Sequence, residues 1–88
     1  MPKFIIERSV PPMSSDELAT VARRSMEVLA QMPHVRWIRS YVSEVDGKIY
    51  CEYDAPSPEA VREHALRAGI PVDRIIPVAL EISPAMFV

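Results

Sequence analysis

The stretch SYVSEVDGKIYCEYD, residues 40–54, contains the strongest local structural signal in the chain. Its Asp46-Gly47 dipeptide is typical of a tight β-hairpin turn, because glycine adopts a positive φ without steric cost. Apolar and polar residues alternate on both sides of this turn. The pattern predicts two antiparallel strands, over residues 35–45 and 48–54, joined at the turn.

A helix is predicted on each side of this hairpin. Before the hairpin, Ser14 and Glu17 have the spacing of a capping box, and apolar residues follow at helical intervals. After the hairpin, Ser57-Pro58 is a typical helix start, and Gly69 is a typical helix end.

A first and a last strand complete the expected fold. The first covers residues 3–10, and the last covers residues 74–82 and contains Pro77, which is best tolerated on a sheet edge. The order strand, helix, strand, strand, helix, strand is the ferredoxin-like, or split βαβ, pattern. We therefore expect a single α+β domain over residues 1–88, with its core within 3–82 and a short C-terminal tail. Two helices should cover one face of a four-stranded antiparallel sheet.

Composition narrows the class of protein. The 88 residues include 10 basic and 12 acidic side chains, for a formal charge of −2, and no segment concentrates lysine and arginine. Nucleic acid is therefore an unexpected partner. No apolar run approaches the roughly 20 residues that span a bilayer. A single cysteine cannot form an internal disulfide, so we expect a soluble protein of the reducing cytoplasm.

The face of the sheet away from the helices is the first candidate functional surface. On the first strand, Phe4 and Ile6 are expected to point toward the helices, and Ile5 and Glu7 away from them. On the hairpin, the residues expected to point toward the helices are Ile38, Ser40, Val42, Ile49, Cys51 and Tyr53. Those expected on the uncovered face are Trp37, Arg39, Tyr41, Tyr50 and Glu52.

An uncovered aromatic face should be buried by something. One interpretation is a homodimer packed sheet to sheet, since isologous dimers are the commonest oligomers. A second is an aromatic-lined ligand pocket, in which Arg39 binds an anionic group and Glu7 acts as a base. A pocket and a dimer interface can coexist on this face. Whether the protein is an enzyme stays open.

Cys51 and His64 are the second candidate site. Both are expected beneath the second helix, where a thiol and an imidazole could form a nucleophile or bind a transition metal. The simpler interpretation is that both are core residues, because free cysteine is usually buried as a small hydrophobe.

Several blocks of residues resemble a family of small bacterial ferredoxin-like proteins of unknown function, often labelled nickel-binding. The blocks are Glu7-Arg8, Trp37-Ile38-Arg39-Ser40-Tyr41-Val42, Tyr50-Cys51-Glu52-Tyr53-Asp54-Ala55-Pro56, Val61-Arg62-Glu63-His64-Ala65 and Gly69-Ile70-Pro71. The resemblance covers nearly the whole chain.

The resemblance implies a homodimer that binds nickel, with Glu7, Cys51 and His64 as the matching donors. Two positions depart from the family pattern. Arg39 stands where relatives often have histidine, and Ser25 where some have cysteine, which removes two nickel donors. Three hypotheses follow: a divalent transition-metal protein, a small-molecule binder or enzyme using the uncovered sheet face, and a structural dimerisation module.

Overall fold

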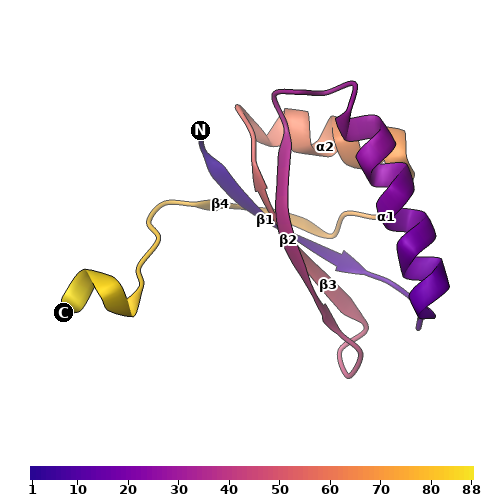
Figure 1. Ribbon diagram of the computed structural model, residues 1–88, viewed down its shortest axis with the longest axis horizontal. Helices are drawn as coiled ribbons and strands as arrows, with labels where there is room; N and C mark the ends of the chain where they lie inside the picture. The colour runs from indigo at the N-terminus through magenta and orange to yellow at the C-terminus, as the bar shows by residue number, and fades with distance from the viewer.

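The computed structural model describes residues 1–88 and has the predicted order of elements (Figure 1). The elements are β1 (Lys3–Ser9), α1 (Ser15–Leu29), β2 (Arg36–Ser43), β3 (Lys48–Asp54), α2 (Pro58–Ala68), β4 (Arg74–Val78) and a 3-10 helix, η1 (Pro84–Phe87). The four strands form one antiparallel sheet in the order β2-β3-β1-β4. Both helices lie on the same side of the sheet (Figure 1). This is the ferredoxin-like α+β fold predicted from the sequence.

The alternation on the two central strands confirms the predicted faces. Phe4 and Ile6 on β1, with Cys51 and Tyr53 on β3, point toward the helices and are buried. Their neighbours Ile5, Glu7, Tyr50 and Glu52 point the other way and pair with one another across the sheet. We call this second side of the sheet the open face. The helix side holds the core, to which α2 contributes Ala60 and Val61.

The predicted orientation was wrong for Trp37. In the pairing of β2 with β3, Trp37 stands opposite Tyr53, but Arg39 stands opposite Glu52, so Ile38 is an extra residue at a bulge. An extra residue reverses the alternation on one side of the bulge. Trp37 therefore packs against the core on the helix side, where its Nε1 donates to Ser40 Oγ at 2.9 Å. Ile38, predicted to point inward, is absent from the core.

The rest of β2 follows the prediction. Arg39 and Tyr41 lie on the open face, opposite Glu52 and Tyr50 on β3. The strand ends at Ser43, two residues before the predicted end, because the turn involves four residues, Glu44 to Gly47. Gly47 has the positive φ, 63°, that the Asp46-Gly47 signal implied.

The helix ends form as the sequence signals indicated. Ser14 Oγ accepts from the Glu17 N–H at 3.1 Å, and the Glu17 carboxylate accepts from the Ser14 N–H at 2.9 Å, which completes the capping box. Ser57 caps α2, and Pro58 is its first residue. These local hydrogen bonds determine where α1 and α2 begin, and they require no contact with distant parts of the chain.

Gly69 ends α2 in the left-handed region, with φ of 67°. A Cβ at this position would meet nothing within 4 Å, so a Gly69→Ala variant is strained only in its backbone. We expect it to lower the free energy of unfolding by about 1 kcal/mol, measured by urea denaturation. Gly69→Asn is the matched control. It should lower the free energy of unfolding by less, because asparagine tolerates the left-handed region better than alanine does. An alanine variant as stable as the wild type would contradict the explanation.

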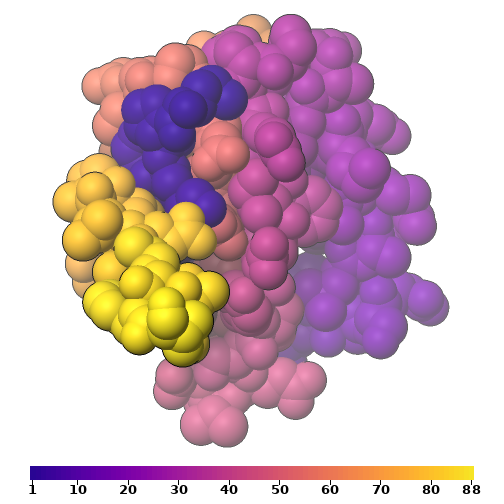
Figure 2. Space-filling model, turned by 60° about the vertical axis from the view of Figure 1, so that its left-hand side comes forward, coloured from indigo at the N-terminus to yellow at the C-terminus, as the bar shows by residue number.

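The last strand and the tail differ from the prediction. β4 ends at Val78 instead of residue 82, and Pro77 lies on it at the sheet edge, as expected. The chain after Val78 extends away from the sheet (Figure 1), and its large apolar side chains, such as Phe87 at 74% exposure, are uncovered. Figure 2 shows this segment in yellow, standing forward beside the N-terminal strand. None of the helices combines the length and the apolar character required to span a membrane.

Candidate functional site

A group of polar side chains lies buried between the sheet and the helices. Arg8 from β1, Ser25 from α1 and His64 from α2 are all at most 5% exposed. Tyr53 from β3 lies against them, because its hydroxyl is 3.4 Å from Arg8 Nη2 and its ring centroid is 5.5 Å from that of His64. Four different elements therefore converge on one buried polar cluster.

His64 joins α2 to α1 within this cluster. Its Nε2 lies 3.0 Å from Ser25 Oγ, whereas its Nδ1 is buried with no hydrogen-bond partner. Burial lowers the pKa of the imidazole below its ordinary value of 6.5, and the nearby Arg8 charge acts in the same direction. His64 is therefore a neutral imidazole at physiological pH, with one nitrogen satisfied by a hydroxyl.

Arg8 is the least expected member of the cluster. Its side chain points toward the helices because it shares the alternation of Phe4 and Ile6, and it is only 2% exposed. Nη1 donates to the Pro71 carbonyl at 2.8 Å, and Nη2 to the Tyr53 hydroxyl. Neither partner is charged, since burial raises the pKa of the Tyr53 phenol above its usual value. No carboxylate forms an ion pair with Arg8.

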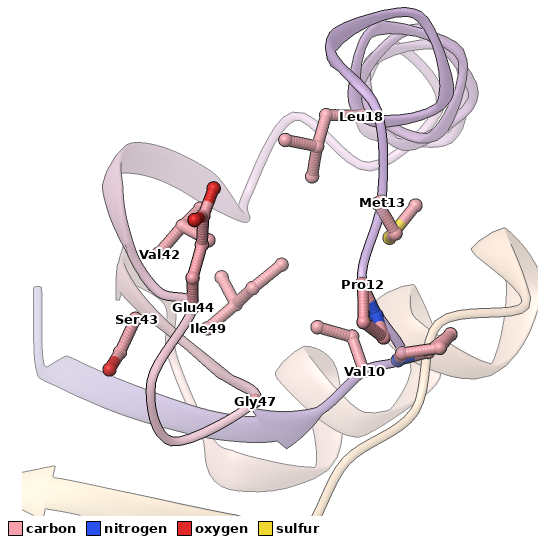
Figure 3. A pocket seen from close by; sticks show the side chains of 10 residues that line it. Val10, Pro12, Met13, Leu18, Val42, Ser43, Glu44, Gly47 and Ile49 are labelled. Atoms are coloured by element: carbon pink, nitrogen blue, oxygen red, sulfur yellow. The ribbon is translucent and has the colours of Figure 1, made fainter.

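A cavity of about 210 Å³ lies between α1 and the sheet, beside Arg8. Most of its wall is apolar, and it includes Ala22 of α1, Trp37 of β2 and Cys51 of β3. A second hollow of about 380 Å³ adjoins it, because the two share Leu18, Val42 and Ile49. Figure 3 shows how Leu18 and Met13 stand across this hollow from Val42 and Ile49 of the hairpin. In Figure 2 the hollow is seen between α1, in purple, and the hairpin, in pink.

The structure does not bring the three predicted metal donors together. Cys51 and His64 lie on the helix side, as predicted, but they form no hydrogen bond with each other. Glu7 lies on the opposite face of the sheet. No three His, Cys, Asp or Glu side chains of one chain are grouped so that they could hold a metal ion. The unpartnered Nδ1 of His64 is one isolated donor, so the residues of a single protomer do not fit a nickel ion.

The open face carries ion pairs where the sequence predicted a pocket. Glu52 contacts Lys3 and lies 3.5 Å from Arg39, and Glu7 lies 3.8 Å from Lys48 and 3.9 Å from Arg74. Both main cavities lie on the helix side instead. Of the five predicted pocket residues, Trp37 alone lines one of them. Arg39, Tyr41, Tyr50 and Glu52 stay on the open face, where Tyr41 is 61% exposed.

Sequence reasoning missed Arg8 as a site residue. The signal was present in the strand alternation, since a residue two positions after Ile6 must share its face. Arginine at such a position normally signals the end of the buried part of a strand. Only the proximity of the Pro71 carbonyl and the Tyr53 hydroxyl, distant in sequence, shows that the guanidinium stays inside.

Comparison with known proteins identifies the family. The family model described as "Nickel responsive protein SCO4226-like" matches residues 4–78. The chain belongs to this family. The crystal structure of SCO4226 from Streptomyces coelicolor A3(2) superposes with a TM-score of 0.81 at 26% sequence identity. The superposition covers 91% of this chain and 99% of that chain, and no curated protein matches. The SCO4226-like match stops at Val78, where β4 ends, so the exposed C-terminal segment lies beyond it.

Proposed function

We propose that this member of the nickel-responsive family is a homodimer that binds nickel between its two protomers. The family match over residues 4–78 is the observation that carries this proposal. The open face supports the pairing of two copies, because it is a whole sheet face without a covering layer. In ferredoxin-like folds the helices shield only one side of the sheet, so the other side is available for packing.

Glu7 is the donor that two protomers can share. It lies on β1, a central strand, and faces away from the helices. Its contacts to Lys48 and Arg74, at 3.8 and 3.9 Å, are at the long limit of an ion pair, so its carboxylate oxygens are not tightly held. Cys51 and His64 lie beneath the helices and would not reach an ion bound on the open face. We therefore assign nickel binding to Glu7 from both copies, with water completing the coordination.

The test combines light scattering with calorimetric titration of nickel. We expect twice the protomer mass of 9.9 kDa, and roughly one nickel ion per dimer. Glu7→Gln should weaken nickel binding at least about tenfold, or about 1.4 kcal/mol, because the amide is a poorer ligand than the carboxylate. Glu44→Gln, an exposed carboxylate in the hairpin turn, is the matched control and should bind as the wild type does.

Two results would contradict the proposal. One is a monomer mass both with and without nickel. The other is nickel binding that survives Glu7→Gln but disappears in His64→Asn, which would place the ion inside one protomer, beneath α2.

A further inference from the structure

Arg8 has a permanent positive charge in a place where nothing on the chain neutralises it. Arginine does not lose its proton in proteins, and buried charges are normally paired with an opposite charge. The two hydrogen-bond partners of Arg8 are the neutral Pro71 carbonyl and Tyr53 hydroxyl. A guanidinium has five N–H donors, so these contacts leave most of its donor capacity unused.

Arg8 is one of the residues that line the cavity of about 210 Å³, and this lining determines the kind of ligand that would fit. Nine of its twelve lining residues are hydrophobic, so the body of a ligand must be apolar. Arg8 is the only lining residue with a positive charge, which suits a single anionic group better than a phosphate with several negative charges. The volume is below the roughly 300 Å³ at which pockets for drug-sized ligands begin. The ligand is therefore small.

We propose that the cavity between α1 and the sheet binds a small apolar carboxylate, whose anionic group pairs with Arg8. Ser25 and Ser40 also line the cavity. The apolar body lies between Trp37 and Ala22, and the adjoining hollow shares the wall at Leu18. This site lies on the opposite side of the sheet from Glu7, so it does not depend on nickel binding.

Trp37 provides the readout, because it is the one tryptophan of the chain and it lines the cavity. Octanoate is the probe, and octanol, with the same number of carbon atoms and no charge, is its neutral match. Titration of the full-length protein, followed by Trp37 fluorescence and by calorimetry, should give an affinity for octanoate at least tenfold higher than for octanol. Acetate, which lacks the apolar body, should bind much more weakly than octanoate.

Two variants locate the site. Arg8→Met keeps an unbranched side chain and removes its charge, so the preference for octanoate over octanol should disappear. Ala22→Phe leaves Arg8 intact and fills the cavity, so it should abolish binding of both probes. Arg36→Met, an exposed arginine on the same sheet, is the control and should preserve the octanoate affinity.

The wild-type comparison alone can overturn the proposal, even if Arg8→Met fails to fold. Equal affinities for octanoate and octanol would remove the role of the charge. Undiminished octanoate binding in Ala22→Phe would place the probe outside the cavity. No binding of octanoate to the wild type would refute the site altogether.

Discussion

An Ile6→Ala variant is expected to lose about 3 kcal/mol of its free energy of unfolding. Ile6 is fully buried, at 0% exposure, on the central strand β1. It stands opposite Cys51 on one neighbouring strand and Ile75 on the other, so the surrounding side chains cannot easily collapse into the space left. A domain of this size has a total stability of about 5–15 kcal/mol. Urea denaturation followed by circular dichroism measures the change.

Ile5→Ala is the matched control, since it removes the same atoms from the adjacent residue on the other face. Ile5 is only partly buried in the protomer, and it stands opposite Glu52 and Ile76. We expect a loss of no more than about 1 kcal/mol at low protein concentration. If two open faces pack together, this loss will grow with protein concentration, because the stability of a dimer depends on the concentration of its protomers. Equal losses for Ile5→Ala and Ile6→Ala in the monomer would contradict the assignment of faces.

The stability of the protein is expected to fall as the pH drops below about 6.5, because His64 must stay neutral in the fold. Its folded-state pKa lies below the ordinary value of 6.5, chiefly through burial. Between the folded and the unfolded pKa, the unfolded chain binds the proton and the folded chain does not. The contribution of His64 is therefore complete above pH 6.5 and is lost progressively below it. The slope for one such group is at most about 1.4 kcal/mol per pH unit.

Urea denaturation at intervals between pH 7.5 and about 5.5 tests this expectation, in a range where the carboxylates remain ionised. His64→Asn should remove the slope, whatever its effect on the stability at pH 7.5. His34→Gln changes the other histidine, which is exposed in the loop after α1, and should keep the wild-type slope. A slope that persists in His64→Asn would assign the pH dependence to another group.

The elements that local chemistry specifies could be predicted from the sequence. The Ser14 and Glu17 capping box, the Ser57-Pro58 start of α2 and the glycine at its end all depend on residues within a few positions of one another. The alternation of Phe4 and Ile6 likewise placed β1 correctly. Such signals require no knowledge of the rest of the chain.

The candidate site was harder to predict, because it depends on contacts between distant residues. One extra residue at Ile38 turned Trp37 to the helix side, so the cavity that Trp37 lines is beneath α1 and not on the open face. A bulge changes the pairing of two strands without a clear mark in the amino-acid pattern. The position of Glu7 was equally hard to predict. The family resemblance grouped Glu7 with Cys51 and His64, although the sheet separates Glu7 from the other two.

The sequence by itself determined the order of the elements and their caps, since these depend on interactions between near neighbours in the chain, and that order indicated the ferredoxin-like fold. Only the tertiary structure decided which side chains share a site. It placed Arg8 inside, close to Tyr53 and the Pro71 carbonyl, because the pairing of β1 with β3 and the position of the loop after α2 bring those groups within hydrogen-bonding distance.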